Sequence, residues 1–497
     1  MKISDKLNSS IILDKNKSYE IEKNYSNSFE LMQKAGLNAA KEIIKNYKKQ
    51  KVLIVCGIGG NGGDGFTVAK DLLNKKWQID VVIIGNKKNI KGDALKALKK
   101  LNIKTKEFDD IDLKKIDLFV DALFGLGLSR EIKGKTKKIL ETIDKHSSPI
   151  VALDIPSGIE SNTGNILGYA PYCELVITFT AYKYGHIIPP GSEKFSRIKV
   201  ENIGIKKSVL SSISPKVEIN NPNQWIKNIK WPKIDDHKYS RGYSLIIGGS
   251  KNMTGAARLA AKAAQRAGSG IVCVASEKEA EQIYYITLIS QIVKSYKNIN
   301  EFNKIISDKR IDSILIGPGL SINQKSILKI KNLLKVNKTT ILDAGAISCF
   351  KGKLYLLKKM ILGKNVIITP HEGELRSIMP NLEGNCIDKA LQAASELRCI
   401  VILKGANTVI ASPDNRALVN NAGAKWLSTA GSGDVLAGII CGLLSNKMEC
   451  FLASAFGVWL HSEIGKYLGA GLVAEDIPIN ISVIYKKLLK LYLKSGS

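Results

Sequence analysis

Short apolar runs of strand length alternate with helix-length segments through the first part of the chain. The run KVLIVC at 51–56 is apolar and rich in β-branched residues, and a glycine-rich turn and a predicted helix near 65–76 follow it. Strands separated in this way by helices are typical of a mostly parallel, doubly wound sheet. Further strands are predicted at 79–84, 116–120, 150–153 and 175–180.

The alternation weakens between about 206 and 236, where the sequence is polar and contains three prolines. Such a stretch is typical of a boundary between domains. We therefore predict one α/β domain over 1–215 and a second over 225–497. No internal repeat links the two, so we expect separate domains and not a duplication.

The strand and helix pattern resumes after the boundary. GYSLIIGG at 242–249 predicts a strand that runs into glycines, and the alanine-rich segment 255–268 predicts a helix with a glycine cap. The apolar segment after GSGD at 431–434 predicts a buried helix. More strands are predicted at 271–275, 312–316, 339–343, 365–369, 400–404, 407–411 and 416–420.

Composition is that of a globular protein, with 44% hydrophobic and 24% charged residues. The chain contains neither an apolar run long enough to span a membrane nor a start typical of a secretory signal. Its eight cysteines are scattered without a C-x-x-C pair. These features lead us to expect a cytoplasmic protein without a membrane partner.

The net charge of +29 raises the question of a nucleic-acid partner. Only nine residues are Arg, so the excess is almost entirely Lys, which lacks the two-pronged geometry that reads phosphates and bases. The lysines are spread along the whole chain beside abundant Ile and Asn. We interpret them as solvated surface and expect no nucleic-acid partner.

Polar residues follow three predicted strands of the first domain. GIGGNGGDG at 57–65 lets the backbone approach a ligand, although on its own it could be a tight turn. VDALFGLGLSR and LDIPSG place Asp121, Asp154 and Ser157 at strand ends, where each Asp alone could be a cap. The carboxyl ends of parallel strands share one edge, so Asn61, Asp121 and Ser157 would offer oxygens to a hard cation. Asp154 would face the ligand and could move a proton.

These motifs, together with two others, resemble the NAD(P)H-hydrate epimerase family over about residues 28–206. The resemblance implies a Rossmann-like, three-layer fold that interconverts the R and S hydrates of NADH and NADPH at C6 of the nicotinamide ring. The family usually has Asn where this chain has Gly60, which removes one amide from the substrate loop. The motifs are LMQKAG (31–36), GIGGNGGDG, DALFGLG, LDIPSG and TFTAYKYGHIIPPGSEKFSRIKVENIGI (178–205). By position, the resemblance implies substrate contacts at Asn61, Gly62, Gly63, Asp64, Gly125, Leu126, Gly127, Leu128, Ser129, Arg130, Glu131 and Asp154, and K⁺ ligands at Asn61, Asp121 and Ser157.

In the second domain, TAGSGDVLAG at 429–438 carries the strongest signal. Small residues lead into a helix whose first N–H groups can stabilise negative charge, and Asp434 can accept a proton from a hydroxyl that attacks a phosphoryl group. An Asp at a helix start can also be a simple cap. Lys404 ends a predicted strand and can neutralise phosphate oxygens. His371 ends another, where a lone His is more often structural.

The second domain resembles the ADP- or ATP-dependent NAD(P)H-hydrate dehydratase family over about residues 237–480. The resemblance rests on HKYSRGYSLIIGGSKNMTGAARLAAKAAQRAGSGIV (237–272), GPGL (317–320), TPHEGE (369–374), KGANT (404–408) and GSGD, in this order. It implies a ribokinase-like α/β fold that phosphorylates the ring hydroxyl of the S hydrate and then eliminates phosphate. It also implies Mg²⁺ with the nucleotide, Asp434 as the catalytic base, substrate contacts at Ala256, Gly319, His371 and Asp434, and nucleotide contacts at Lys404, Gly405, Ala406, Asn407, Thr408 and Gly433.

One departure from that family concerns LDAGAIS at 342–348, where Gly345 stands in place of a usual Asp. The lost acid could weaken the handling of Mg²⁺ or substrate, and we expect activity to persist because Asp434 and the anion site remain.

The leading hypothesis is a bifunctional repair enzyme in which the epimerase supplies the dehydratase with its required epimer. The alternatives are a ribokinase-like small-molecule kinase with a regulatory front domain, and a first domain that binds without catalysis. The expected partners are the hydrates NADHX and NADPHX and the nucleotide, and the resemblance implies a homo-oligomer. The choice between ADP and ATP stays open, with a leaning to ADP.

Overall fold

The computed structural model describes residues 10–212, 216–420 and 425–495. The chain divides into two compact units, Met1–Glu218 and Ile219–Ser497. The domain ranges expected from sequence, 1–215 and 225–497, stay predictions, and residue 215 lies outside the described residues. Each unit is an α/β fold with its own sheet, so the predicted fold class is confirmed.

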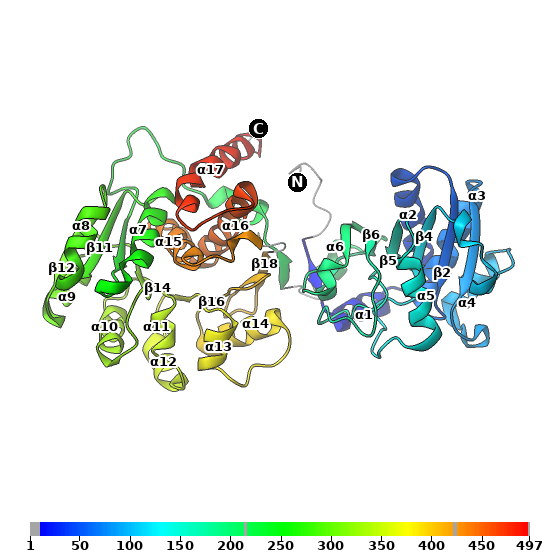
Figure 1. Cartoon of the computed structure of the whole chain (residues 1–497), viewed down its shortest axis with the longest axis horizontal. Helices are drawn as coiled ribbons and strands as arrows, with labels where there is room; N and C mark the ends of the chain where they lie inside the picture. The colour runs from blue at the N-terminus through cyan, green and yellow to red at the C-terminus, as the bar shows by residue number, and fades with distance from the viewer. Residues whose placement is uncertain (1–9, 213–215, 421–424, 496–497) are drawn as a thin grey trace. The chain divides into compact units, whose positions relative to one another are not determined.

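The first unit is built on a six-stranded, fully parallel sheet (Figure 1). The inner strands are buried because helices cover both faces, which explains why they are continuous apolar runs in the sequence. The edge strand Phe195–Glu201 is mostly half-buried or exposed and was not predicted. Their order across the sheet is β3 (Gln78–Ile83), β2 (Lys51–Cys56), β4 (Leu118–Ala122), β5 (Ile150–Leu153), β6 (Cys173–Phe179) and β8 (Phe195–Glu201).

One helix of this unit begins earlier than the sequence predicts. The predicted helix near 65–76 is α3 (Gly60–Asn74), so the glycines form its first turn and not a preceding loop. Gly62 is required there because a Cβ on it would lie 1.9 Å from the carbonyl oxygen of Gly57. The other helices are α1 (Lys15–Lys23), α2 (Ser28–Asn46), α4 (Gly92–Lys100), α5 (Gly134–Asp144) and α6 (Lys207–Ser212), and the short strand β1 (Ile12–Leu13) pairs with β7 (Tyr182–Lys183).

The second unit is built on a ten-stranded sheet that is parallel from β12 to β16 and antiparallel from β16 to β18. The predicted strands all occur, with ends shifted by one or two residues. The order is β12 (Ile292–Tyr296), β11 (Ile271–Glu277), β10 (Tyr243–Ile247), β13 (Ser313–Ile316), β14 (Thr339–Leu342), β15 (Val366–Ile368), β16 (Ile400–Leu403), β17 (Thr408–Ala411), β18 (Ala417–Asn420) and β9 (Val217–Ile219).

Helices cover both faces of this sheet, as Figure 1 shows. One face carries α7 (Thr254–Arg266), α15 (Ser432–Ser445), α16 (Cys450–Leu468) and α17 (Asp476–Ser495). The opposite face carries α10 (Gln324–Lys335), α11 (Gly345–Ser348), α12 (Leu354–Ile361), α13 (Glu372–Ile378) and α14 (Cys386–Leu397), and α8 (Glu281–Thr287) and α9 (Ile299–Ile306) lie toward β12.

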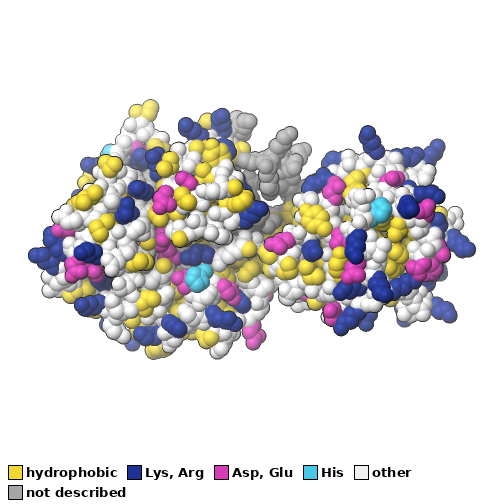
Figure 2. Space-filling view, in the orientation of Figure 1, with side chains coloured by type: hydrophobic (Ala, Val, Ile, Leu, Met, Phe, Trp, Pro, Cys, Tyr) yellow, Lys and Arg dark blue, Asp and Glu magenta, His cyan; other side chains and the backbone are white. Residues whose placement is uncertain are grey.

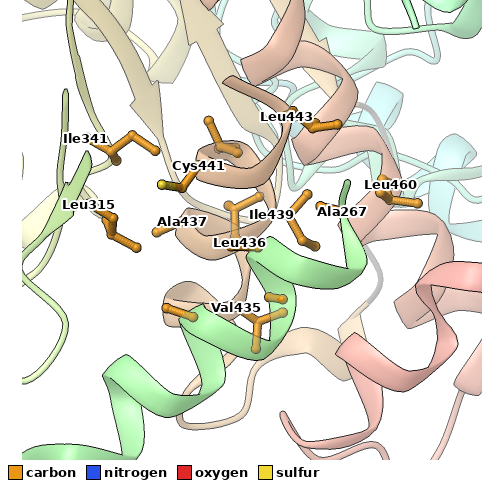
Figure 3. Close-up of a cluster of buried hydrophobic side chains, with 14 of the residues drawn as sticks. Ala267, Leu315, Ile341, Val435, Leu436, Ala437, Ile439, Cys441, Leu443 and Leu460 are labelled. Carbon is orange, nitrogen blue, oxygen red and sulfur yellow. The ribbon is translucent and has the colours of Figure 1, made fainter. Parts of the chain in front are cut away.

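The core of the second unit centres on α15, whose side chains are buried on every side as predicted. Cys441 and Ala437 lie toward Leu315 and Ile341 of the sheet in Figure 3. On its other side α15 packs directly on the backbone of α7 at Gly438. The approach is so close that a Cβ at Gly438 would lie 2.3 Å from the carbonyl oxygen of Ala260. Small residues on both helices make this close approach possible.

The two units divide between Glu218 and Ile219, inside the polar stretch 206–236, so part of this stretch belongs to the second unit. Within it, β9 adds a strand to the edge of the ten-stranded sheet. Trp225 is fully buried, stacks on Phe456 with ring centroids 4.5 Å apart, and donates its indole N–H to Asn220 Oδ1 at 3.1 Å. A single large side chain therefore anchors a segment whose composition is otherwise polar.

Basic side chains are scattered over the visible surface in Figure 2, between acidic and apolar ones. No helix within the described ranges is long and apolar enough to cross a membrane.

Substitution Trp225→Ala is expected to lower the free energy of unfolding of the second unit by about 3–5 kcal/mol, because it removes a buried aromatic ring and leaves a cavity. Denaturant unfolding of the full chain measures the change. Trp426→Ala is the matched control, since Trp426 is 40% exposed. An equal, small effect in both variants would contradict the assignment of Trp225 to the core.

Candidate active sites

The first unit has a cavity of about 490 Å³ at the carboxyl ends of β2, β4 and β5. Its walls include the start of α3 at Gly59–Asn61, the loop Gly125–Leu128, and Asp154. Helix α1 completes the cavity through Tyr19 and Glu22. This is the sheet edge at which parallel α/β proteins bind ligands, so the cavity is the candidate active site of this unit.

Asp154 is held in an ion pair that the sequence motifs do not reveal. Its carboxylate Oδ1 accepts from Lys183 Nζ at 2.5 Å and from Thr178 Oγ1 at 3.1 Å, and its backbone is in the left-handed region at φ +61°. The carbonyl of Asp154 also accepts from His186 Nε2 at 2.8 Å. Burial alone raises the pKa of Asp154, but the Lys183 ammonium outweighs it and holds the pKa below its usual value. Asp154 is therefore an ionised carboxylate in a fixed orientation.

A second carboxyl in the same cavity has the opposite character. Burial raises the pKa of Asp64 well above its usual value, and the charge of Asp154 raises it further. The same two effects raise the pKa of Glu22 at the cavity wall to about 7. Paired acids whose pKa values are pushed apart by their surroundings can act as one proton donor and one proton acceptor. The cavity thus contains the groups required for acid–base chemistry.

The three predicted cation ligands lie around the loop at Phe124. Ser157 donates from Oγ to Asp121 Oδ1 at 2.6 Å and from its backbone N–H to Oδ2 at 2.8 Å, and its Oγ accepts from the N–H of Phe124 at 2.9 Å. Asn61 Nδ2 donates to the Phe124 carbonyl at 3.0 Å. Asn61 Oδ1 is buried without a hydrogen-bond partner among the described residues. An orphaned buried oxygen beside a buried carboxylate fits a cation.

Not every predicted substrate contact reaches this cavity. Asn61, Asp64 and the loop Gly125–Leu128 line it. Gly62 and Gly63 are buried inside the first turn of α3, where a Cβ at Gly63 would meet the Met32 side chain. Ser129, Arg130 and Glu131 are exposed beyond the lining residues, and Glu131 pairs with Lys133 at 2.9 Å.

In the second unit, Lys404 connects several groups at the carboxyl ends of the strands. Its Nζ lies 2.8 Å from Oδ1 of Asp343, which also accepts from Thr369 Oγ1 at 2.7 Å. Asp343 is 1% exposed, and although burial alone lowers the pKa of Lys404, the Asp343 carboxylate outweighs it and raises that pKa. A permanently charged lysine is therefore held at this edge of the sheet, where it can meet phosphate oxygens.

The first turn of α15 lies beside that lysine. Gly431 caps the helix at φ +86°, and a Cβ at Gly433 would lie 3.5 Å from Lys404 Nζ. Burial and the nearby Asp343 raise the pKa of Asp434 to about 6, with Lys404 acting in the opposite direction. A carboxylate with this pKa is ionised at neutral pH and is still a useful proton acceptor.

The remaining predicted contacts are distributed around the same edge. Ala256 lies in the first turn of α7. Gly319 (φ +70°) packs against the loop before α7 so closely that a Cβ on it would lie 2.2 Å from the carbonyl oxygen of Met253. His371 is exposed and caps its own helix, with Nδ1 accepting from the N–H of Gly373 at 3.0 Å. The predicted nucleotide loop follows Lys404, with Gly405 and Ala406 exposed, Asn407 buried and Thr408 opening β17.

Three functional contributions were missed by the sequence reading. Lys183 lies in the segment TFTAYKYGH that supported the resemblance, and Asp343 lies in LDAGAIS, but neither residue was assigned a role. No motif in α1 predicts that this helix lines the first cavity. Glu22 reaches the cavity wall only through the fold.

Comparisons with known proteins identify relatives of both units. A family profile described as YjeF-related protein N-terminus matches residues 28–185, and one described as NAD(P)H-hydrate dehydratase matches residues 244–482. The chain thus joins a YjeF-related unit to a unit of the NAD(P)H-hydrate dehydratase class. The proteins named bifunctional NAD(P)H-hydrate repair enzyme Nnr from Moorella thermoacetica and Dictyoglomus turgidum are 31% and 33% identical to it. The matches cover 88% of this chain in both cases, and 88% and 89% of the relatives.

The chain belongs to the family of bifunctional NAD(P)H-hydrate repair enzymes, so the resemblance predicted from the motifs is confirmed. A similar solved structure is the ADP/ATP-dependent NAD(P)H-hydrate dehydratase from Bacillus subtilis, co-crystallised with ATP and Mg²⁺. It is 26% identical, with a TM-score of 0.47 over 54% of this chain and 98% of that chain.

Restoring the usual acid by Gly345→Asp is expected to destabilise the second unit by about 1–3 kcal/mol. A Cβ at Gly345 would lie 2.3 Å from the backbone oxygen of Leu320, so this loop has no room for a side chain. Thermal and denaturant unfolding measure the loss. Gly255→Ala is the control, because a Cβ there meets nothing within 4 Å. Unchanged stability in Gly345→Asp would show that the loop can move aside.

Proposed function

We propose that the first unit interconverts the R and S hydrates of NADH and NADPH, and that the second unit dehydrates the S form with ADP or ATP. One observation carries the proposal: each unit places a buried or half-buried carboxyl near a lysine at the carboxyl edge of its sheet. Asp154 pairs with Lys183 in the first unit, and Asp434 lies beside Lys404 in the second. Membership of the family across both units supports assigning these pairs to two successive reactions.

In the first unit, epimerisation at C6 requires a C–O bond to break and to form again on the other face of the ring. The ring nitrogen provides the electron pair while a protonated Asp64 gives a proton to the departing hydroxyl, which leaves as water. Asp154 then accepts a proton as water adds to the resulting iminium carbon. Asn61, Asp121 and Ser157 would hold K⁺, which would supply fixed positive charge beside the substrate loop.

In the second unit, the ring hydroxyl of the S hydrate attacks the terminal phosphoryl group of the nucleotide. Asp434 accepts the hydroxyl proton, and the N–H groups of Ser432 and Gly433 with Lys404 stabilise the charge on the transferred group. Phosphate then leaves as the ring nitrogen donates electrons, and loss of the adjacent C–H proton restores the dihydropyridine. The described residues contain no group of three or more His, Cys, Asp or Glu side chains that could hold a metal ion, so we propose that Mg²⁺ is held mainly by the nucleotide phosphates.

The finer assignments rest on the family resemblance. We propose ADP as the preferred donor, a homo-oligomeric assembly and a cytoplasmic location. The small-molecule partners are NADHX, NADPHX and the nucleotide, without nucleic acid or membrane.

The decisive test gives the full chain a mixture of R and S NADH hydrate with Mg²⁺, K⁺ and either ADP or ATP. Recovery of NADH absorbance should be complete, and the better nucleotide identifies the donor. Asp434→Asn should lower the dehydration rate about 10²-fold or more, since general-base catalysis contributes at least that much. Asp154→Asn should stop recovery at the S fraction, after subtraction of spontaneous epimerisation.

Several results would contradict the proposal. A stable phosphorylated product would indicate a small-molecule kinase, because elimination would be missing. Recovery by the wild-type chain that stops at the S fraction, apart from spontaneous epimerisation, would reduce the first unit to a binding module. Complete recovery by Asp154→Asn at the wild-type rate would show that Asp154 is not required for epimerisation.

The dehydration rate of the S hydrate should fall as pH decreases through about 6, the raised pKa of Asp434. The ionised carboxylate is the base, so activity is present above this pKa and is lost below it as the group is protonated. Steady-state kcat/KM on S hydrate across this pH range measures the effect. The residual kcat/KM of Asp434→Asn should not fall as pH decreases through this range. If it falls in the same way as for the wild type, the group that titrates is not Asp434.

A further inference from the structure

A cavity in the second unit lies away from the groups proposed for catalysis. Its volume is about 770 Å³, and it forms where residues 228–241 cross the C-terminal ends of α7 and α15 and the side of α17. Asp434 lies at the opposite end of α15. That helix has 14 residues, which places the cavity roughly 20 Å from the proposed phosphoryl-transfer site. None of the residues proposed above for binding or catalysis lines it.

The interior of this cavity is aromatic. Trp231 and Tyr485 meet edge to face with ring centroids 5.9 Å apart, and Phe456 meets Tyr485 in the same way at 5.8 Å. Leu443 and Met448 complete an apolar floor. Such walls favour a flat, apolar or aromatic body, which can stack or make edge contacts with the rings.

The rim of the cavity is basic. Lys230, Lys233, Arg241 and Arg266 line it, against the acids Asp235 and Asp236 alone. The Asp236 carboxylate is already engaged, because it accepts from the backbone N–H of Lys233 at 2.8 Å and from Ser240 Oγ at 3.0 Å. Arg241 Nη2 donates to the Gly268 carbonyl at 3.5 Å, and its other N–H groups and those of Arg266 can act on an anionic ligand, for which the planar, two-pronged guanidinium is suited.

The Trp231 indole adds a specific polar group. Its Nε1 atom is buried and has no hydrogen-bond acceptor among the described residues. Leaving a buried N–H unpaired costs free energy, and a bound acceptor would remove that cost. By contrast, the buried indole N–H of Trp225 is satisfied by Asn220. The unpaired donor thus belongs to the tryptophan that lines the cavity.

We propose that this cavity is a second ligand site, which binds an organic anion with a flat aromatic body. Trp231 and Tyr485 contact the ring system, Arg241 and Arg266 contact the anionic group, and the Trp231 N–H donates to an acceptor of the ligand. The proposal does not depend on the reactions assigned to the two units.

The test uses the full chain and two fluorescent probes, 1-anilinonaphthalene-8-sulfonate and its uncharged counterpart N-phenyl-1-naphthylamine. The sulfonate should bind saturably, more tightly than the uncharged probe, and in the presence of saturating ADP and Mg²⁺. Removing one guanidinium by Arg241→Gln or Arg266→Gln should weaken sulfonate binding about tenfold, the effect of one charge-assisted hydrogen bond, and should leave the uncharged probe unaffected. Trp231→Phe keeps a ring and should weaken the sulfonate about fivefold, the effect of one neutral hydrogen bond.

Arg416→Gln is the matched control, because Arg416 pairs with Asp414 at the turn between β17 and β18 and does not line the cavity. It should leave both probes unchanged. Arg266 is exposed, so its variant folds even where Arg241→Gln does not. The proposal is overturned if Arg266→Gln and Trp231→Phe bind the sulfonate within twofold of the wild type, or if ADP and Mg²⁺ displace the probe completely.

Discussion

The direct backbone contact between α7 and α15 is the constraint on which the second unit depends. A Cβ at Gly438 or Gly442 would lie 2.3 Å from a carbonyl oxygen of α7, so the helices approach more closely than side chains would permit. This contact fixes the position of α15 as the central helix of the second unit. One end presents Asp434 to the carboxyl edge of the sheet, and the other end closes the floor of the aromatic cavity. A single packing contact thereby positions two separate surfaces.

Much of the fold is predictable from the sequence because both sheets are covered on two faces. Their inner strands must then be continuous apolar runs, and such runs identified the parallel strands of both units except β8 and β12. These two strands lie at sheet edges and are mostly half-buried or exposed, so they carry no continuous apolar run. Two further features could not be found in this way. Strand β9 has three residues within a polar stretch, and its pairing depends on β18 far along the chain. The early start of α3 was hidden because glycines usually indicate a turn, whereas here Gly62 is required by the close approach to Gly57.

Individual site residues were predictable where they lie at the end of a strand or in the first turn of a helix within a recognisable motif. Asp121 and Asp154 lie at the ends of β4 and β5, and Asp434 lies in the first turn of α15. Their electrostatic states were not predictable. The pKa of Asp154 is lowered because Lys183 reaches it from 29 residues along the chain, and the pKa of Asp64 is raised because it is buried near that charge. A pKa depends on burial and on charged partners from distant segments. Residue type and spacing therefore identify the carboxyl groups but not which of them donates a proton.

The position of β9 affects the order in which the chain folds during synthesis. Residues of the first unit are complete once Glu218 has left the ribosome, so that unit can fold while translation continues. Asn220 follows β9 directly, yet its amide bonds to Asn420, 200 residues later. At typical elongation rates of about 5–20 residues per second, this strand waits roughly 10–40 s for its partner. A nascent first unit could therefore already bind its ligand while the edge of the second sheet is still open.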